Sequence, residues 1–400
     1  MLVVDMFSAA DGLYSAAGGA ALAGLLFLTV AALAVAPVRA STATPMESLA
    51  ETLNRRADEA LERMIAVYWD PVELHFHKFS DRSGWTDFWW LAQVWDAVMD
   101  GVVRSRERGQ VNTEWLRLLD YVYSGQAART PTFTNQFYDD EAWWALASLR
   151  AYEITGNRIY LHRAEALWAD IRTGWSDELG GGIYWRKDER RTKNACINGP
   201  AALLAARLYA IEGRPEDLQM AERIFAWLKA TLVSPWGLVW DNVAVVDGSI
   251  DKRTFTYNQG TFIGAAVALY KATGKAEYLA DARRVADATL RYLVDENGLL
   301  RNEGTGDGGG FKGIFVRYLV SLVDALPTTD PYRSDRERYL AFLVKNASMA
   351  WEKARNAQGL FASNWAGPPR QERVESLTNA SGVMLLNLTA LAVWRHGYEL

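Results

Sequence analysis

Two adjacent acidic residues, Asp139 and Asp140, have the clearest potential for chemistry in this sequence. They open an aromatic-rich run with helical spacing, so both carboxylates are expected at the start of a helix, beside flat apolar side chains. Such a pair can cleave a glycosidic bond, because one acid protonates the leaving oxygen and one carboxylate meets the positive charge developing on the sugar carbon. Alternatively, Asp139 caps the helix and Asp140 only complements its dipole.

The elements that must position this pair are helices. Twelve helical segments are expected after residue 45, and the Val/Ile-rich alternating runs typical of strands are nearly absent. Six segments carry charges on one face, as solvent-facing helices do, and six are rich in Ala, Gly, Leu and aromatic residues all round, as buried helices are. The charged set is expected over residues 46–68, 113–124, 158–173, 215–232, 276–294 and 334–355, and the apolar set over 85–99, 139–155, 200–211, 259–273, 313–326 and 376–396.

The alternation of the two kinds of helix predicts the fold class. Six hairpins, each with a polar outer and an apolar inner helix, close naturally into an all-α (α/α)6 barrel, formed here by one domain over residues 46–400. An open solenoid also stacks helix pairs. The inner helices begin with polar and aromatic clusters in place of capping repeats, which favours closure around a central pocket.

Composition narrows the class of partner. The formal net charge is −5 without a basic block, so nucleic acid is not expected as a partner. The single Cys196 allows no internal disulfide, and the lone His75-x-His77 pair lacks a third ligand, so neither a metal nor another cofactor is expected. Seventeen Trp and seventeen Tyr include several beside Gly and Asn in loops, a placement that stacking on sugar rings would explain.

The N-terminal region is separate from the helical hairpins. Residues 12–38 carry no charge and are followed by Arg39 and Ala40, as in a secretory signal with a cleavage site near Ala40. The run is also long enough, at about 20 residues, to remain as a membrane anchor. Residues 1–45 are therefore expected to be a signal peptide or membrane anchor plus linker, with the remainder secreted or anchored outside the cytoplasm.

Polar residues precede or open each apolar helix. If the inner helices run parallel, these clusters meet at one mouth of the barrel, where amide side chains suit sugar hydroxyls because each can donate and accept. The asparagines could equally be helix caps, and Lys312 a surface lysine. The glycine-rich segment at residues 304–310 lacks the Gly-Lys-Ser/Thr ending of a phosphate cradle and is interpreted as a flexible turn.

Five segments together resemble glycoside hydrolase family 76, the endo-acting α-1,6-mannanases. They are Tyr138-Asp-Asp-Glu-Ala-Trp-Trp, Gly181-Gly-Ile-Tyr-Trp, Asn198-Gly-Pro-Ala-Ala-Leu-Leu-Ala-Ala-Arg-Leu-Tyr, Tyr257-Asn-Gln-Gly and Phe311-Lys-Gly-Ile-Phe. The resemblance runs from about residue 48 onward and implies an (α/α)6 fold and retaining hydrolysis of α-1,6-linked mannose backbones. It also implies that Asp139 is the nucleophile and Asp140 the acid/base, and it leads us to expect Asn where Cys196 stands.

The implied mechanism makes physical sense for neighbouring residues. Retention requires carboxyl groups about 5–5.5 Å apart, which adjacent side chains can reach. Two close carboxylates cannot both ionise freely, so one pKa is expected to rise as an acid catalyst requires. We expect a monomer that takes α-mannan or mannooligosaccharides as substrate. The expected walls of the sugar groove are Trp143, Trp185 and Phe311, and the expected hydroxyl-binding residues are Asn194, Asn198, Tyr257, Asn258, Gln259 and Lys312.

Three rival functions remain open on the sequence alone. A transglycosidase would pass α-mannan to another cell-surface glycan instead of water. An unsaturated glucuronyl hydrolase or a sugar epimerase would use the same fold, although the four His are poorly placed for the His pairs of such epimerases. A non-catalytic glycan-binding protein would keep the groove without turnover, and the presence of both Asp residues counts against it.

Overall fold

A computed structural model of the chain describes residues 47–370 and 372–399. The N-terminal segment in which a signal peptide or membrane anchor is expected lies outside these residues. Within them, twelve α-helices make up most of the chain, and five short strands form one two-stranded and one three-stranded antiparallel sheet.

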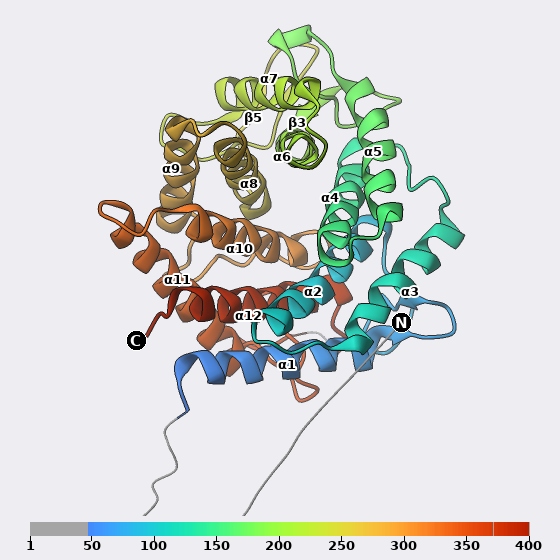
Figure 1. Ribbon diagram of the computed structural model, residues 1–400, viewed down its shortest axis with the longest axis vertical. Helices are drawn as coiled ribbons and strands as arrows, with labels where there is room; N and C mark the ends of the chain where they lie inside the picture. The colour runs from blue at the N-terminus through green and yellow to red at the C-terminus, as the bar shows by residue number, and fades with distance from the viewer. Residues whose placement is uncertain (1–46, 371, 400) are drawn as a thin grey trace, which may run out of the picture. The chain divides into compact units, whose positions relative to one another are not determined.

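Six helices form an inner ring, and six others cover it from outside (Figure 1). The inner helices are α2 (Phe88–Glu107), α4 (Tyr138–Thr155), α6 (Ala195–Glu212), α8 (Thr256–Thr273), α10 (Gly308–Ala325) and α12 (Ser376–His396). The outer helices are α1 (Leu49–Tyr68), α3 (Thr113–Arg129), α5 (Arg158–Ile171), α7 (Pro215–Leu232), α9 (Ala276–Tyr292) and α11 (Tyr332–Lys353). The strands are β1 (Trp69–Asp70), β2 (His75–Phe76), β3 (Thr192–Asn194), β4 (Asn242–Ala244) and β5 (Ile250–Asp251), and 3-10 turns span Arg172–Gly174 and Glu178–Gly180.

The inner ring is closed. Each inner helix packs against the next one along the chain, and α12 packs against α2. The protein is therefore an (α/α)6 barrel, as predicted, and the open solenoid is excluded. All twelve predicted helices are present. The largest boundary error concerns α2, which is predicted to end at residue 99 but ends at Glu107. The helix α6 begins at Ala195, before the predicted start at residue 200, because Pro200 lies inside it and removes only a single backbone hydrogen bond.

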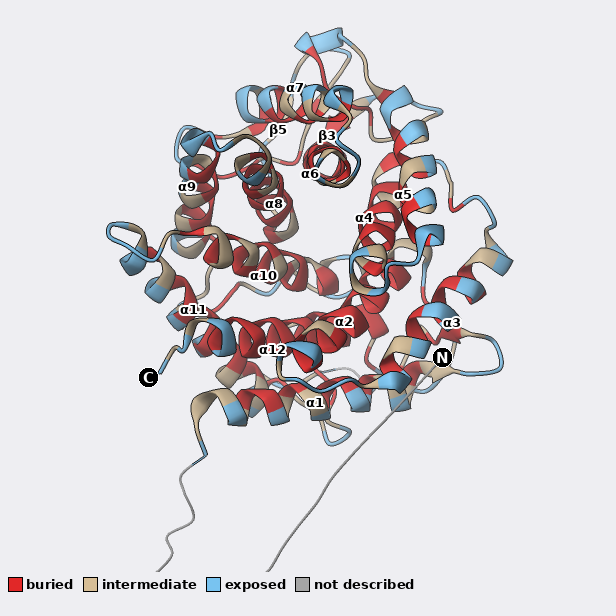
Figure 2. Cartoon of the chain, viewed as in Figure 1, coloured by how far each residue is buried: buried red, intermediate tan, exposed pale blue. Residues whose placement is uncertain are grey.

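Burial follows the predicted division between inner and outer helices (Figure 2). Every residue of α12 from Ser376 to Val393 is buried, whereas α9 buries only one face and exposes its charged side chains. Within the described residues, α12 is also the one helix long and apolar enough to cross a membrane, and it lies in the core of the barrel. Its composition is explained by that position, because an inner helix contacts protein on all sides.

The two ends of the barrel differ in their connections. At one end, α4, α6 and α8 each terminate at a glycine with φ near +70°, namely Gly156, Gly213 and Gly274. A left-handed residue ends a helix abruptly, so the next outer helix begins after two residues. The longer loops, which lead from outer to inner helices, therefore gather at the opposite end, together with the starts of the inner helices.

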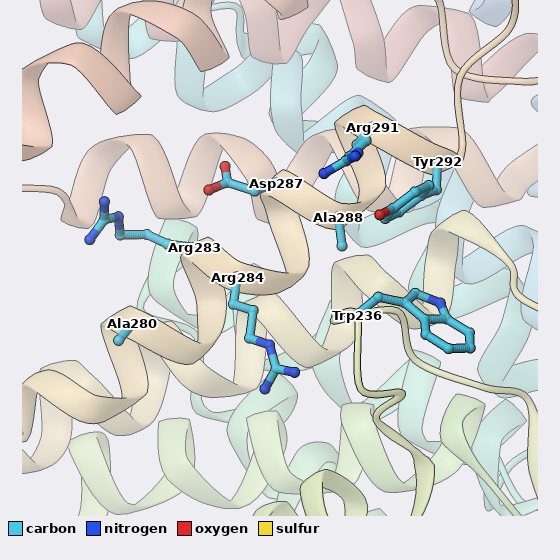
Figure 3. A pocket seen from close by; sticks show the side chains of 8 residues that line it. All are labelled: Trp236, Ala280, Arg283, Arg284, Asp287, Ala288, Arg291 and Tyr292. Carbon is cyan, nitrogen blue, oxygen red and sulfur yellow. The ribbon is translucent and has the colours of Figure 1, made fainter.

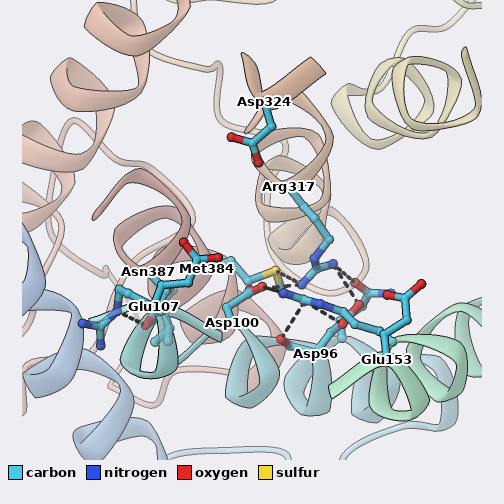
Figure 4. A network of polar contacts seen from close by, with 12 residues as sticks. Asp96, Asp100, Glu107, Glu153, Arg317, Asp324, Met384 and Asn387 are labelled. Atoms are coloured by element: carbon cyan, nitrogen blue, oxygen red, sulfur yellow. Dashed lines mark hydrogen bonds and ion pairs between the residues drawn. The ribbon is translucent and has the colours of Figure 1, made fainter. Parts of the chain in front are cut away.

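A buried charge cluster joins three inner helices near the short-turn end (Figure 4). Asp96 and Asp100 of α2 face Arg150 of α4 and Arg317 of α10. Arg150 lies 2.9 Å from Asp96, and Arg317 lies 3.1 Å from Asp96 and 3.3 Å from Asp100. Asp100 is fully buried, so the two guanidinium groups must compensate both carboxylates. These ion pairs tie α2, α4 and α10 together across the barrel.

Candidate active site

The start of α4 is fixed by a neighbouring loop. The backbone N–H of Tyr138 donates to the carbonyl of Trp185 at 3.0 Å, and that of Lys187 donates to the carbonyl of Gln136 at 3.0 Å. Phe137 is the N-cap residue and makes no side-chain capping bond. The alternative in which Asp139 caps the helix is therefore wrong. Instead, the paired segments bring the indole of Trp185 against the first turn of α4.

Asp139 has one bonded and one free carboxylate oxygen. The indole Nε1–H of Trp185 donates to Oδ2 at 3.0 Å, and the thiol of Cys196 donates to the same oxygen at 3.2 Å. Oδ1 is buried and has no hydrogen-bond partner among the described residues. Two donors thus fix the orientation of the carboxylate and leave one oxygen available for chemistry.

The two neighbouring carboxyl groups titrate differently. Burial raises the pKa of Asp139 to about 6, against the lowering effect of the Cys196 and Trp185 donors. Burial together with the charge of Asp139 raises the pKa of Asp140 to about 8, although Asn135 donates to its Oδ2 and opposes the shift. Between these two values Asp139 is ionised and Asp140 is protonated. One group is then a carboxylate and the other an acid, although burial raises both pKa values where only one was predicted to rise.

Both carboxyl groups line a cavity of about 460 Å³ at the long-loop end of the barrel. Seven of the predicted site residues line it, and they are Asp139, Asp140, Trp143, Trp185, Asn194, Tyr257 and Phe311. The Oδ1 atom of Asn194 is buried without a hydrogen-bond partner among the described residues, so it can accept a hydrogen bond from a ligand hydroxyl.

Aromatic rings form a continuous side of this cavity. Tyr257 stacks on Phe311 with ring centroids 3.9 Å apart and an interplanar angle of 10°. Trp143 lies 6.5 Å from Tyr257, and Trp89 lies 6.2 Å from Trp143. Flat apolar faces of this kind suit the C–H faces of a sugar ring, while the carboxyl and amide groups nearby suit its hydroxyls.

Asn198 and Gln259, which are predicted to bind sugar hydroxyls, instead form hydrogen bonds with the backbone of loops. Their predicted role is therefore corrected. Asn198 is fully buried, accepts from the backbone N–H of Ile183 at 2.8 Å and donates to its carbonyl at 3.0 Å. Gln259 is equally buried, accepts from the N–H of Val239 at 2.7 Å and donates to its carbonyl at 2.8 Å. Neither lines the cavity, because their amides satisfy buried backbone groups of the preceding loops.

Lys312 and Asn258 also lie behind the cavity wall. The Nζ of Lys312 donates to the carbonyl of Ser363 at 2.5 Å and lies 4.0 Å from the ring centroid of Trp365, and burial lowers its pKa to about 7. Lys312 is therefore neither the predicted sugar ligand nor a surface lysine. Asn258 is buried and donates to Oδ1 of Asp241 at 3.4 Å. It supports a residue of the cavity wall without lining the cavity itself.

Asp307 is a cavity residue that sequence reasoning missed. The indole Nε1–H of Trp90 donates to its Oδ1 at 2.7 Å. The following glycine run, interpreted from sequence as a flexible turn, is the first turn of α10. A Cβ on Gly309 would lie 2.1 Å from Oγ1 of Thr378, so the run allows α10 to approach α12 closely. An acid placed directly before three glycines and an apolar run was the available signal.

Asp241 and Arg253 are further cavity residues outside the predicted set. They flank β4 and β5, which pair with β3 in a small sheet in which Asn194 lies opposite Asn242. Nη2 of Arg253 lies 3.5 Å from Oδ2 of Asp241. Strands of two or three residues are too short to produce an alternating pattern, which explains why the sequence did not reveal them.

This chain is similar in sequence to known glycosidases. The profile of glycosyl hydrolase family 76 matches residues 52–393. Mannan endo-1,6-alpha-mannosidase DCW1 of Candida glabrata is 25% identical over 268 residues, which cover 61% of this chain and 56% of that protein. The DCW1 protein of Saccharomyces cerevisiae is 26% identical, with 49% and 48% covered. The chain thus spans about half the length of these curated relatives.

Solved structures give broader coverage. The GH76A alpha-1,6-mannanase from Salegentibacter sp. HEL1_6 is 37% identical, with a TM-score of 0.79, and the match covers 85% of this chain and 99% of that one. An inactive variant of the same protein, in which two consecutive aspartates are replaced by asparagine, was solved with α-1,6-mannotriose and has a TM-score of 0.78 at 37% identity over the same shares of the two chains. The Lin0763 protein from Listeria innocua is 30% identical, with a TM-score of 0.78 and coverage of 87% and 99%.

Proposed function

The chain belongs to glycosyl hydrolase family 76, and on that premise we propose that it is a retaining, endo-acting hydrolase of α-1,6-linked mannose backbones. The observation that carries the proposal is the inequivalence of the two adjacent acids in the cavity. Asp139 is held by two donors and has the lower pKa, whereas Asp140 has the higher pKa of the two. The inactive double Asp→Asn variant of the Salegentibacter mannanase supports the choice of an aspartate pair.

In the first step, the free Oδ1 of Asp139 attacks the anomeric carbon of the mannose bound beside it. The C–O bond to the leaving sugar breaks as a mannosyl–aspartate ester forms, through a transition state with positive charge on the ring. Asp140 transfers its proton to the departing glycosidic oxygen. The donors from Trp185 and Cys196 keep Oδ2 from rotating into the attacking position.

In the second step, the ionised Asp140 removes a proton from a water molecule, which attacks the anomeric carbon and releases Asp139. Two inversions at the same carbon give net retention. Neighbouring Cα atoms lie about 3.8 Å apart, which favours the short carboxyl separation of retaining enzymes over the separation of roughly 6.5–9.5 Å that an inverting enzyme needs for its water.

Cleavage of linear α-1,6-mannan by the wild-type protein and by Asp139→Asn and Asp140→Asn variants tests this proposal. We expect short mannooligosaccharides from the wild type and loss of nearly all cleavage in both variants. Asn135→Ala serves as a control, because it removes the donor to Asp140 and the acceptor for the backbone N–H of Phe137 but keeps both acids, and it should retain measurable cleavage. Substantial activity in Asp139→Asn would remove the nucleophile assignment.

The acceptor in the second step separates hydrolysis from transfer. A sugar hydroxyl in place of water would turn the same intermediate into a transfer product, so products longer than the starting α-1,6-mannotetraose would identify a transglycosidase. We favour water because relatives of this chain bear the names mannosidase and mannanase.

We also propose that the protein acts outside the cytoplasm, through the apolar segment at residues 12–38. A polymeric mannan cannot cross a membrane to reach an enzyme inside the cell. Mass spectrometry of the mature N-terminus in the culture medium and membrane fractions distinguishes a cleaved signal from a retained anchor, and recovery of the intact chain in the cytosol would refute export.

A further inference from the structure

Two exposed aromatic side chains line a cleft on the outer surface of the barrel (Figure 3). Trp236 in the loop after α7 is 56% exposed, and Tyr292 at the end of α9 is 45% exposed. Arg284 and Arg291 of α9 line the same cleft, whose volume is about 420 Å³. Two large exposed aromatic rings on either side of one cleft are a common feature of binding surfaces, so this cleft is a candidate binding site.

The fold itself does not require tryptophan at position 236. The same four-residue turn follows α7, α9 and α11, and each is closed by a glycine N–H donating to a carbonyl three residues earlier, at 2.9–3.0 Å. The residue before that glycine is Trp236 in the first turn, Asn297 in the second and Gln358 in the third. The glycine that ends each turn is followed by a leucine. An isolated β-bridge flanks each turn, and the three bridges are Val233↔Val239, Val294↔Leu300 and Arg355↔Phe361.

Tyr292 is also exceptional among its equivalents. It stands two residues before the first bridged residue of its turn, and the same position is Thr231 after α7 and Lys353 after α11. Thus the two positions that form this cleft carry aromatic rings, whereas the corresponding positions of the other hairpins carry small or polar side chains. The equivalent turns therefore show that the turn conformation does not require an aromatic residue at either position, and that the two aromatic rings are particular to this cleft.

The arginines of the cleft contact its two sides and have free hydrogen-bond donors. Nη2 of Arg284 donates to the carbonyl of Pro235 at 2.7 Å, which ties α9 to the turn that presents Trp236. The guanidinium carbon of Arg291 lies 5.1 Å from the ring centroid of Tyr292. In the part of the chain that the structure describes, neither arginine is paired with a carboxylate. Each guanidinium therefore has donors left for hydroxyl groups.

One aromatic contact extends from this cleft to Trp240, the residue before Asp241 in the sequence. The ring centroid of Trp236 lies 6.4 Å from that of Trp240, and Nζ of Lys252 lies 5.4 Å from the ring of Trp240. The next residue, Asp241, lines the catalytic cavity. Because outer helices end where inner helices begin, Trp236 and Tyr292 lie at the same end of the barrel as that cavity.

We propose that the Trp236–Tyr292 cleft binds a second stretch of the same α-1,6-mannan chain whose cleavage is proposed for the cavity. This inference rests on the proposed function, since it takes its ligand from it. Mannose rings would stack on Trp236 and Tyr292, and the two arginines would donate to their hydroxyls. A polymer is long enough to contact both the cavity and the cleft, so we expect the cleft to favour polymeric over short substrates.

The test uses Trp236→Asn combined with Tyr292→Thr, the residue types that equivalent turns already carry. We expect kcat/KM on linear α-1,6-mannan to fall about tenfold, while kcat/KM on α-1,6-mannotetraose stays within twofold of the wild type. Retardation in native gels containing the same mannan should weaken to a similar degree. Trp236→Phe should restore most of the binding, and thermal unfolding checks that each variant is folded.

The controls separate this inference from the function on which it rests. Trp394→Gln replaces an exposed tryptophan near the opposite end of the barrel and should change neither substrate's kinetics. If the wild type cleaves both substrates and the double variant matches it on the polymer, the cleft is not a mannan site although the enzyme assignment stands. If the wild type cleaves neither substrate, the proposed function and the mannan assigned to the cleft are both wrong.

Discussion

Replacing Trp185 by phenylalanine should raise the pH at which the enzyme becomes active. The substitution keeps an aromatic ring in the cavity wall but removes the N–H that donates to Oδ2 of Asp139 at 3.0 Å. That donor favours the ionised form of Asp139, so its loss raises the pKa of the carboxyl from about 6. A nucleophile must be ionised, and the acidic limb of the kcat/KM profile therefore moves upward.

The size of the shift follows from the strength of the bond. Hydrogen bonds to charged groups contribute about 1.5–3 kcal/mol, and one pH unit corresponds to about 1.36 kcal/mol. The lower end of that range corresponds to a shift of about one unit, which is the change we expect. The basic limb reflects Asp140, whose pKa is about 8. The bell should narrow, and its maximum should move from about pH 7 to about pH 7.5.

The assay is the initial rate on α-1,6-mannotetraose between pH 4 and pH 10, analysed as kcat/KM. The acidic and basic limbs of the kcat/KM profile report macroscopic pKa values of the coupled Asp139–Asp140 pair. The quantity to compare is therefore the shift of each limb relative to the wild type. Cys196→Ser is the matched control, because a hydroxyl still donates to Asp139 and should leave the acidic limb nearly in place. An unmoved acidic limb in Trp185→Phe would refute the assignment of Asp139 as the group that must ionise.

Three further substitutions test the electrostatics and the corrected site. Asp140→Asn should raise the free energy of unfolding by up to about 5 kcal/mol at pH 9 and change it little at pH 4, because the native pKa of Asp140 is raised from 3.8 to about 8 and the wild type loses stability as the pH rises between these two values; equal effects at both pH values would contradict the shift. Gln259→Ala should cost about 2–3 kcal/mol of stability in urea titrations without altering the product pattern from α-1,6-mannan, since its amide serves the loop backbone. Arg317→Leu should cost about 3–5 kcal/mol by leaving Asp96 and Asp100 undercompensated, and a loss below 1 kcal/mol would show that the cluster is not tightly coupled.

The helical architecture was predictable because the spacing of apolar residues along the sequence indicates helices directly. Apolar residues recur at helical spacing, and charged faces alternate with uniformly apolar ones, so both the twelve helices and their inner or outer positions follow from the sequence. The Asp139–Asp140 pair was predictable for a different reason. Adjacent acids at a helix start remain close together in any fold that keeps the helix, so their proximity needs no tertiary information.

The other residues of the site could not be predicted, because the direction of a side chain and the path of a loop depend on tertiary packing. Asn194 and Asn198 flank the start of α6, yet Asn194 lines the cavity while Asn198 binds the backbone of Ile183. Asp241 and Asp307 reach the cavity from loops whose paths are set by contacts with distant helices and strands. Amides and acids near helix starts are equally suited to ligands and to loop carbonyls, and only tertiary packing decides between them.

The most direct test of the central claim is to trap the covalent intermediate. Incubation with an activated 2-deoxy-2-fluoro-α-mannosyl substrate slows the second step, and peptide mapping by mass spectrometry then locates the attached sugar. We expect one fluoromannosyl group on Asp139 of the wild type and none on Asp139→Asn. Attachment to any other residue, or release of a first product with the opposite anomeric configuration, would contradict it.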